Sequence, residues 1–356
     1  MLKARKCIRE MAEYSALINY PNITLRLDMN ENTSGCSPRV LSRLRSLDAQ
    51  TLALYPNRDD GEKLVADSLG ISPAQTLLTN GADEAIDILC RAYLEPDDEI
   101  IIVVPTFTMY EVFAKTQNAK VVRISTGPEF SFPMQQVIGA VTANTRAIVI
   151  CNPNNPTGIP ADRASILKVI EAAPDAAILL DEAYFHFYGQ TLMDQIGKIP
   201  NLFIARTFSK AYGLAGMRLG MIAGPEEQMS VLRRMASPFN VNAFAIECLA
   251  EALADRQFLD DYVAQIKAGR EWLRMQLEQM NFKCWPSQTN FLLCRFGAEK
   301  KKILEALRAR GVALRDRPDC EGCVRISIGT QKEMERLIAE LKQVVSTVLV
   351  GKQAVL

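Results

Sequence analysis

Thr207-Phe-Ser-Lys-Ala-Tyr-Gly-Leu-Ala-Gly-Met-Arg218 is the stretch of this sequence that decides how the chain folds. It begins directly after an apolar run, 202–205, that is typical of a buried strand. Lys210 stands near its start among small residues and hydroxyl groups, and Arg218 follows eight positions later. A strand that leads into such a segment predicts a rigidly held lysine beside groups that bind an anion.

This arrangement suits a covalent site for an aldehyde cofactor. The Lys210 amine can form a Schiff base with pyridoxal phosphate (PLP), while Thr207, Ser209 and Arg218 can hold the phosphate. A helix-start serine followed by a surface lysine and a surface arginine would explain the same residues. The stretch alone leaves both interpretations open, and the preceding part of the chain favours the first.

Length and composition indicate an ordinary globular protein with more than one domain. At 356 residues the chain is too long for one compact core, so we expect two domains. The 41 Lys and Arg residues balance 41 Asp and Glu residues, which predicts no nucleic-acid partner and no attraction to a membrane surface. No apolar run is long enough to span a bilayer, and the charged first residues lack the apolar core of a secretion signal. We therefore expect a cytoplasmic protein.

Cysteine and histidine usage limits the chemistry further. Most of the nine cysteines lie inside apolar segments, which predicts reduced, buried thiols. Cys320 and Cys323 have the spacing of a zinc pair, but no second pair accompanies them, so we expect no metal. His186 is the only histidine, which leaves little room for a Ser-His-Asp hydrolase. Beside three aromatic residues it is more typical of a packed ring than of a catalyst.

Short apolar runs alternate with amphipathic helical patterns through the first two thirds of the chain. The runs expected as strands span 76–79, 100–104, 120–125, 147–151, 177–180, 202–205 and 219–223. Apolar strands separated by helices predict an α/β fold with a mainly parallel, seven-stranded type of sheet between two layers of helices.

The pattern changes after about residue 240. Two predicted strands, 291–295 and 324–328, follow a long predicted helix over 258–280 and alternate with further helices. This pattern predicts a smaller α/β unit. The predicted domains are an N-terminal arm over 1–40 that joins the small domain and a dimer contact, a large domain over 41–240 and a small domain over 241–356.

Candidate ligand-binding residues follow the predicted strands, where open parallel sheets bind their ligands. Gly81-Ala82-Asp83 joins a strand to a helix, whose N–H groups and positive dipole end suit a phosphate. A plain Asn-Gly turn explains that junction equally well. Phe107 follows a later strand, where its ring could stack on a flat heterocycle, although rings at such positions are more often core.

Two motifs are more specific. Cys151-Asn-Pro-Asn-Asn-Pro-Thr-Gly158 has two Asn-Pro steps that restrict its conformations, so Asn155 can donate to a phenolate-like oxygen on a cofactor ring. Asp181-Glu-Ala-Tyr184 ends an apolar strand, where a buried carboxylate needs a cationic partner. A protonated pyridine nitrogen would be that partner for Asp181 and would make the ring an electron sink. Tyr184 would then bond the ring oxygen beside Asn155.

These motifs, in this order, resemble the fold-type I PLP-dependent aminotransferases of class I and II over nearly the whole chain. The resemblance implies Lys210 as the catalytic Schiff-base lysine and Asp181 on the pyridine nitrogen. It implies that Tyr55 reaches the phosphate in the partner subunit, so we expect a homodimer with shared active sites. The other cofactor-binding residues that it implies are Gly81, Ala82, Asp83, Phe107, Asn155, Tyr184, Thr207, Ser209 and Arg218.

Within this family the chain is most similar to the histidinol-phosphate aminotransferases. That likeness implies transfer of the amino group of histidinol phosphate to 2-oxoglutarate, giving imidazole acetol phosphate and glutamate, in histidine biosynthesis. It implies that Tyr14, Arg315 and Arg325 bind the substrate, since a planar guanidinium can grip either a carboxylate or a phosphate. The stretches that carry the likeness are LRLDMNEN at 25–32, NGADEAIDIL at 80–89, DEAYFHF at 181–187 and VRISIGT at 324–330.

The expected cycle is ping-pong between a small-molecule amino donor and a 2-oxo acid acceptor. The freed Lys210 amine would move a proton between substrate and cofactor, which requires a lowered pKa. An aromatic or specialised-metabolite aminotransferase and a PLP-dependent amino-acid-phosphate decarboxylase stay open as alternatives on the same fold. A cofactor-binding regulator would need a DNA-binding module, for which the predicted arm has no room.

Overall fold

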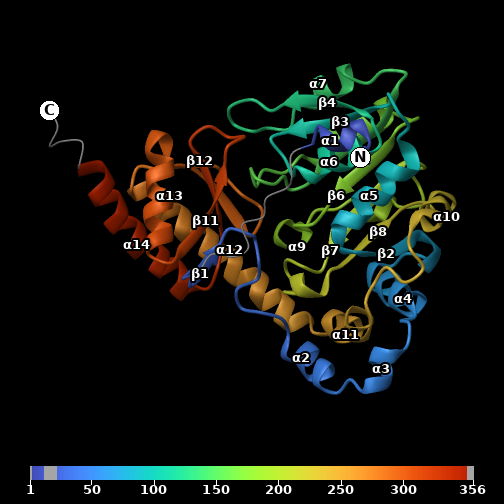
Figure 1. Ribbon diagram of the computed structural model, residues 1–356, viewed down its shortest axis with the longest axis horizontal. Coiled ribbons are helices and arrows are strands. Elements are labelled where there is room, and N and C mark those ends of the chain that lie inside the picture. Colours follow the sequence, from blue (N-terminus) through green and yellow to red (C-terminus); the bar gives the residue numbers. More distant parts are fainter. Residues whose placement is uncertain (1, 12–21, 351–356) are drawn as a thin grey trace.

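The computed structural model describes residues 2–11 and 22–350, which form two β-sheets with helices packed around them (Figure 1). The larger sheet has seven strands in the order β2-β8-β7-β6-β5-β3-β4. All neighbouring strands pair in parallel except β8, which is antiparallel to both β2 and β7. The strands are β2 (Thr76–Asn80), β3 (Glu99–Val104), β4 (Lys120–Ser125), β5 (Thr145–Cys151), β6 (Ala177–Asp181), β7 (Leu202–Thr207) and β8 (Leu219–Ala223).

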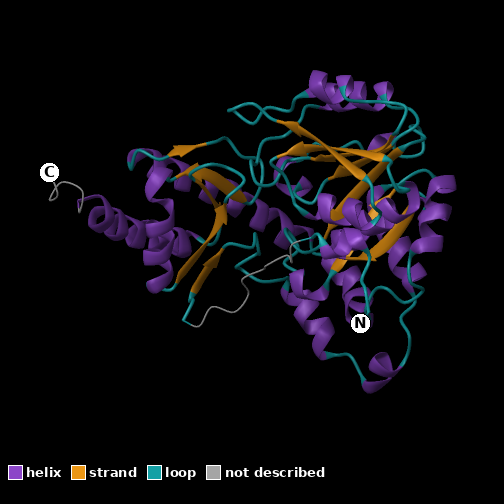
Figure 2. Cartoon of the chain, turned by 45° about the horizontal axis from the view of Figure 1, so that its top comes forward, coloured by secondary structure: helices purple, strands orange, loops and turns teal. Residues whose placement is uncertain are grey.

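The central strands are buried on both faces because nearly every side chain in them is apolar. Every residue of β6, β7 and β8 is buried. Alternate residues of these strands belong to two different hydrophobic cores, one on each face of the sheet. Figure 2 shows the strands of this sheet with helices on both sides.

One face is covered by α5 (Gly81–Tyr93), α6 (Met109–Thr116) and α10 (Glu226–Met235). The other face is covered by α2 (Pro38–Arg45), α4 (Arg58–Leu69), α7 (Met134–Gly139), α8 (Arg163–Ala172) and α11 (Ala243–Ala254). Several helices on this second face begin at polar side chains that accept a first-turn N–H, as Ser37, Asn57, Asp162 and Asn242 do. The short helices are α1 (Lys6–Arg9), α3 (Ala49–Ala53) and α9 (Phe185–Tyr188).

The smaller sheet has five strands in the order β1-β11-β12-β10-β9. Its first strand comes from the N-terminal part of the chain and pairs in parallel with β11. The strands are β1 (Leu25–Leu27), β9 (Lys283–Cys284), β10 (Phe291–Arg295), β11 (Val312–Arg317) and β12 (Cys323–Ser327). A third hydrophobic core lies between this sheet and the helices α12 (Arg256–Gln279), α13 (Lys300–Ala309) and α14 (Gln331–Val350).

The long helix α12 connects the two units. It packs against α9 beside the larger sheet and against α14, β9 and β10 in the smaller one (Figure 1). The segment between β1 and α2 runs back toward the larger sheet, so the junction between the two sheets is built from chain segments far apart in sequence.

The predicted α/β fold with a mainly parallel seven-stranded sheet and a smaller α/β unit is confirmed. The prediction omitted β9, β11 and the helices α1, α3, α9 and α10. β11 was overlooked because its second half, Arg315 to Arg317, is charged and lacks the apolar run that marks the central strands. Among the described residues, no helix is both long enough and apolar enough to cross a membrane.

Candidate active site

The predicted site residues gather where the parallel strands end. The strands β3, β5, β6 and β7 run in the same direction, so the segments after them emerge at one edge of the sheet. The strand order reverses between β3 and β5, because β4 lies outside β3 while the chain continues on the other side at β5. Ligands of open α/β sheets bind at such a reversal.

Lys210 lies after β7, with its amine directed at the segment that follows β1. Its Nζ donates to the carbonyl oxygen of Met29 at 3.1 Å. Burial, followed by the Arg325 cation, lowers the pKa of Lys210 to about 8, against the opposing effect of the Glu31 and Asp83 carboxylates. A lysine in this environment is partly neutral near neutral pH, which is the form that reacts as a nucleophile or a base.

Arg325 crosses from the smaller sheet to the larger one. It is buried on β12, and its Nη1 donates to Asn155 Oδ1 at 2.6 Å, while its Nη2 donates to the carbonyl oxygen of Asp28 at 2.6 Å. Its guanidinium also lies 5.4 Å from the centroid of the Phe291 ring. One side chain therefore joins the Asn-Pro loop, the segment after β1 and the smaller sheet.

Asp181 is buried at the end of β6 and is held by two donors. Tyr110 Oη donates to Oδ2 at 2.5 Å, and the Ala183 N–H donates to Oδ1 at 2.9 Å. Burial is the main cause that raises the pKa of Asp181, and these two hydrogen bonds oppose that effect. The carboxylate is thus fixed in position and keeps lone pairs for a further donor.

Tyr110, which holds Asp181, was not among the site residues predicted from the sequence. It lies on α6 with no exposed surface, and burial raises the pKa of its hydroxyl well above the usual range. Its position three residues after Phe107 was the available signal, because the two rings pack edge to face with centroids 5.6 Å apart. Nothing in the sequence alone, however, indicates that a residue of α6 reaches the end of β6.

The junction of β2 and α5 forms a tight cradle with Arg218. Gly81 has a left-handed φ of 74°, and a Cβ at this position would lie 2.5 Å from Arg218 Nη2. Arg218 Nη2 donates to Asp83 Oδ2 at 3.1 Å, which holds the guanidinium over the first turn of α5. The side chain of Asn80, the N-cap residue, accepts no hydrogen bond from that turn, so the first N–H groups of α5 have no side-chain cap.

The remaining cofactor candidates lie near this edge. Thr207 and Ser209 are buried, and the Ser209 N–H donates to Thr207 Oγ1 at 3.1 Å. Tyr184 is buried and its Oη accepts from Asn30 Nδ2 at 2.9 Å. Phe107 is half-buried in the segment after β3.

The last three candidates are Arg315, Tyr55 and Tyr14. Arg315 lies directly opposite Arg325 in the β11–β12 ladder, so the two arginines share one face of the smaller sheet. Tyr55 is 78% exposed and stacks on Phe239, with ring centroids 4.1 Å apart, on the surface of this chain. Tyr14 lies outside the described residues.

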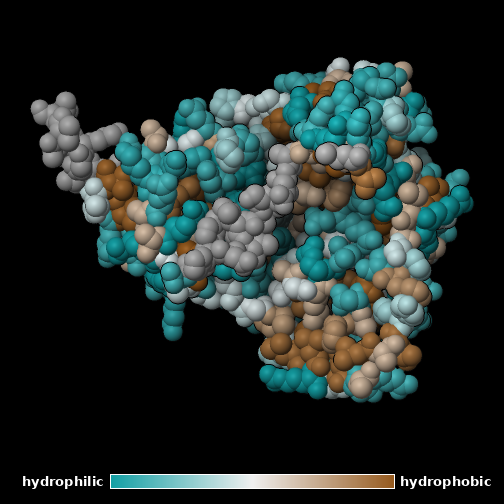
Figure 3. Space-filling view, viewed as in Figure 1, coloured by the Kyte–Doolittle hydropathy of each residue, from teal (hydrophilic) through white to brown (hydrophobic). Residues whose placement is uncertain are grey.

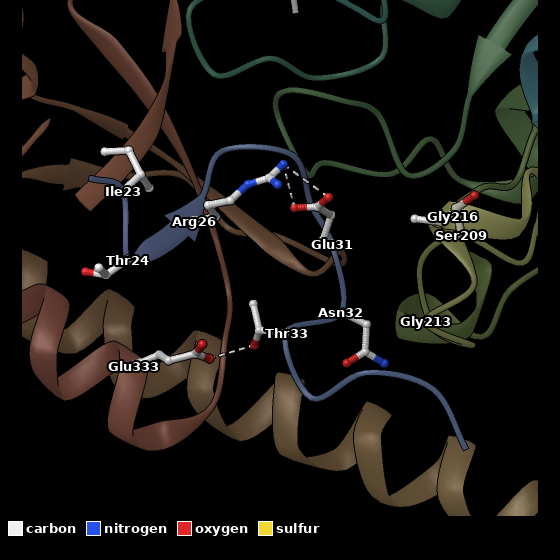
Figure 4. A pocket seen from close by; sticks show the side chains of 11 residues that line it. Ile23, Thr24, Arg26, Glu31, Asn32, Thr33, Ser209, Gly213, Gly216 and Glu333 are labelled. Carbon is white, nitrogen blue, oxygen red and sulfur yellow. Dashed lines mark hydrogen bonds and ion pairs between the residues drawn. The ribbon is translucent and has the colours of Figure 1, made fainter. Parts of the chain in front are cut away.

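A cavity of about 360 Å³ opens between the segment after β1 and the Lys210 loop (Figure 4). Ser209 and Gly213 line its Lys210 side, and Glu31 and Asn32 line the opposite side. Arg26 forms an ion pair with Glu31 at 3.2 Å within this lining. Its volume lies in the range of sites for small molecules.

A buried ion pair supports the segment that carries Asp181 and Tyr184. Glu182 accepts from Arg206 Nε at 2.9 Å, from Thr191 Oγ1 at 2.8 Å and from the Leu192 N–H at 3.1 Å. The Arg206 guanidinium lies 3.7 Å from the centroid of the Phe185 ring. These contacts join the residue after β6 to β7 and to the segment at Thr191 and Leu192.

His186 packs among aromatic rings. Its ring lies edge-on to Phe185 and Tyr212, with centroids 5.2 and 5.1 Å away. Burial and the nearby cations of Arg206 and Arg256 lower the pKa of His186 to about 3, so it is neutral near neutral pH. In the part of the chain that the structure describes, no three His, Cys, Asp or Glu side chains converge as a metal site.

Comparisons with known proteins agree with this geometry. Residues 22–341 match the family model described as aminotransferase class I and II. The histidinol-phosphate aminotransferase of Dehalococcoides mccartyi is 31% identical over 348 residues, covering 95% of this chain and 96% of that protein. The one from Roseiflexus castenholzii is 35% identical over 333 residues, covering 90% of this chain and 89% of that protein.

A solved structure shares the fold. The crystal structure of histidinol-phosphate aminotransferase from Sinorhizobium meliloti in complex with pyridoxal-5'-phosphate superposes with a TM-score of 0.86 at 23% identity, covering 92% of each chain. The sequence match over most of the chain and the shared fold establish that this protein belongs to the class I and II aminotransferase family.

Proposed function

We propose that this aminotransferase uses PLP held on Lys210 to transfer the amino group of histidinol phosphate to 2-oxoglutarate, giving imidazole acetol phosphate and glutamate. The observation that carries the proposal is the Lys210 amine, whose pKa is lowered to about 8 at the carboxyl edge of the parallel sheet. The relatives named histidinol-phosphate aminotransferase support the choice of substrate.

The residues at this edge fit PLP. The cradle at Gly81, where a Cβ would collide with Arg218, suits a phosphate held by α5 N–H groups, Thr207, Ser209 and Arg218. Asp181, held by Tyr110, suits the pyridine nitrogen. Asn155 and Tyr184 are the candidates for the ring oxygen, and Phe107 is the candidate for stacking on the ring.

When bound, PLP supplies an aldehyde that condenses with amines and a ring that accepts electrons. The residues of this chain then position and move protons. Asp181 would hold the proton on the ring nitrogen, because a buried carboxylate is stabilised by a cationic donor. Lys210 Nζ would accept the proton that leaves the amino-bearing carbon of the substrate and would return it to the carbon on the other side of the substrate nitrogen.

Arg325 is the proposed binding residue for the substrate's anionic group, with Arg315 beside it. A planar guanidinium can bind a carboxylate or a phosphate through two parallel hydrogen bonds, so one pocket can serve both substrates in turn. Tyr14 is proposed as a further phosphate contact. The cavity beside the Lys210 loop is the proposed route by which the amino donor enters.

The cofactor proposal is tested with purified protein and PLP. We expect an absorbance band of the covalently bound cofactor, and after borohydride reduction a labelled peptide that contains Lys210. The Lys210→Ala variant should lose the label. Label on another lysine, or no band at all, would refute Lys210 as the attachment site.

The substrate proposal is tested by separate half-reactions with histidinol phosphate, glutamate and phenylalanine. Histidinol phosphate and glutamate should each convert the bound cofactor to its amine form within the enzyme's turnover time. If only phenylalanine is turned over, the amino donor is an aromatic amino acid. The histidinol-phosphate proposal then fails and the cofactor proposal stands. Release of carbon dioxide from an amino-acid phosphate would indicate a decarboxylase.

We further propose a homodimer in which Tyr55 of one subunit reaches the phosphate of the other. The support is an apolar surface patch of exposed side chains over α2, α3 and α11 (Figure 3). Exposed patches of this kind mark protein interfaces. The exposed apolar side chains of the patch are Leu41, Leu52, Leu54, Tyr55, Phe239 and Phe244.

The domain boundaries at residues 40 and 240 and the cytoplasmic location also remain proposals. Support for a reducing compartment comes from the nine cysteines, all of which lie in the described residues and are unpaired. Cell fractionation followed by detection of the protein would test the location.

A further inference from the structure

Two cysteines face each other across the edge of the smaller sheet. β9 pairs antiparallel with β10 so that Cys284 lies opposite Cys294, and their Sγ atoms are 2.7 Å apart. The Trp285 N–H donates to the carbonyl oxygen of Leu293 at 3.1 Å, which makes the neighbouring pair, Trp285 and Leu293, the hydrogen-bonded one. The cysteines therefore occupy a non-hydrogen-bonded position, where antiparallel side chains come closest and the Cα separation suits a disulfide.

The two cysteines differ in their exposure to solvent. Cys294 has no exposed surface, and burial raises the pKa of its thiol well above the usual range. Cys284 is half-buried on β9, the edge strand. A small oxidant in solution therefore has access to Cys284 rather than to Cys294, whose nearest thiol is that of Cys284.

The chain between the two cysteines touches the active site on two sides. The Gln288 N–H donates to the carbonyl oxygen of Gly158 at 2.8 Å, at the end of the loop that carries Asn155. Asn290 Nδ2 donates to the carbonyl oxygen of Asn30 at 3.1 Å, and Asn30 holds the hydroxyl of Tyr184. A bond between the cysteines would close this segment into a ring at its base.

We propose that Cys284 and Cys294 form a reversible redox-modification site, at which a hydroperoxide oxidises the pair to a disulfide that fixes β9 to β10. This site goes beyond transamination and does not depend on the proposed function.

The chemistry balances with hydrogen peroxide as the oxidant. The Cys284 thiolate attacks one peroxide oxygen, the O–O bond breaks, and the leaving hydroxide takes up a proton, which gives a sulfenic acid and water. The Cys294 sulfur then attacks the Cys284 sulfur, and the displaced hydroxide leaves as water with the Cys294 proton. Two thiols lose two electrons and two protons in total, and peroxide is reduced to two water molecules.

A single peptide reports the result. Trypsin cleaves after Lys283 and Arg295, so Cys284 to Arg295 forms one peptide that contains both cysteines. After hydrogen peroxide treatment of the full-length protein and alkylation of free thiols, we expect this peptide to be unalkylated and lighter by two hydrogen atoms. Dithiothreitol before alkylation should restore two alkylated cysteines. Peroxide should also raise the Tm by a few degrees, because the bond restricts the unfolded chain, and dithiothreitol should reverse the rise.

Variants separate this bond from general oxidation. Cys284→Ser and Cys294→Ser should each abolish the lighter peptide and the reversible rise in Tm. Cys320→Ser removes a buried thiol from another core of the same small unit and should change neither result. Doubly alkylated peptide after peroxide, irreversible higher oxidation of Cys284 without the internal bond, or a dimer linked through Cys284 would each overturn the proposal.

Discussion

Three buried ionisable side chains of the candidate site are each held by hydrogen bonds within the protein. Lys210 donates to Met29, Arg325 donates to Asn155 and Asp28, and Asp181 accepts from Tyr110 and Ala183. Buried charges are costly unless they are paired or hydrogen-bonded, so a protein retains such a cluster mainly where chemistry needs it. The pKa of Lys210 is lowered and the pKa of Asp181 is raised, so both shifts favour the neutral form of the side chain.

The lowered pKa of Lys210 predicts how the apoprotein takes up PLP. Only the neutral amine condenses with an aldehyde, so the association rate constant should rise with pH and level off above about 8. Arg325→Gln should move this midpoint to higher pH, because the Arg325 cation is the second cause of the lowered pKa. Stopped-flow absorbance at several pH values measures both midpoints.

The lowered pKa of Lys210 also determines the direction in which the free energy of unfolding changes with pH. The pKa of Lys210 in the folded protein, about 8, lies below its ordinary value of 10.5, so the unfolded chain binds more protons between these two values. The contribution of Lys210 to the free energy of unfolding therefore increases as pH rises through this window. A Lys210 midpoint near 10.5 in the apoprotein would contradict both statements.

Tyr110→Phe tests the support of Asp181. The variant removes one hydrogen bond to the buried Asp181 carboxylate. The pKa of Asp181 should therefore rise further, and its interaction with a protonated ring nitrogen should weaken. Hydrogen bonds to charged groups contribute roughly 1.5–3 kcal/mol, so we expect PLP affinity to fall by about tenfold or more. Tyr93→Phe is the matched control, because it removes a hydrogen bond to Gln228 far from the site. Equal affinities in the two variants, measured by titration of the apoproteins, would exclude this role of Tyr110.

At the scale of elements, the strand-to-helix junction at Gly81 has room only for glycine. Gly81→Ala would place a Cβ against Arg218 in a left-handed backbone conformation, which costs roughly 1 kcal/mol before any collision. We expect PLP affinity to fall by about tenfold to a hundredfold, since Arg218 and the α5 N–H groups both move. Gly139→Ala, where a Cβ meets open space and φ is ordinary, should leave the affinity unchanged. Affinity for PLP is measured by absorbance titration.

The segment after β6 depends on one buried ion pair. Arg206→Met leaves the Glu182 carboxylate buried without its cation, so the free energy of unfolding should fall by roughly 3–5 kcal/mol. Arg274→Met breaks the exposed pairs of Arg274 with Glu271 and Glu278 on α12 and should cost about 1 kcal/mol or less. Urea unfolding of both variants compares them directly, and equal losses would show that burial of the pair is unimportant.

At the scale of the whole molecule, the apolar patch over α2, α3 and α11 predicts association of two chains. Leu52→Asp together with Leu54→Asp should convert the proposed dimer to a monomer, because two carboxylates would enter an apolar interface. Met275→Asp, at an exposed residue of α12 outside the patch, is the control. Analytical ultracentrifugation gives the mass in each case, and a wild-type protein that is monomeric at micromolar concentration would refute the interface.

The complete fold shows which strands can be predicted from local sequence patterns and which cannot. The central strands were predicted within a few residues because strands buried on both faces are continuous apolar runs, as in Ala177–Asp181 and Leu219–Ala223. β9 and β11 were missed because a strand at or near the edge of a small sheet needs no such run. Their pairing with distant strands, rather than their composition, makes them strands.

The sequence by itself determined the family and the mainly parallel sheet, and it selected Lys210 as the candidate reactive lysine, because these depend on local patterns and on motifs with few alternative explanations. Tertiary structure alone decided that Tyr110 holds Asp181, that Arg325 reaches Asn155, and that Cys284 faces Cys294. These pairs join residues on different elements, and the last is set by strand register. Such contacts arise only when the sheets and helices pack, since no local pattern encodes which distant side chains will meet.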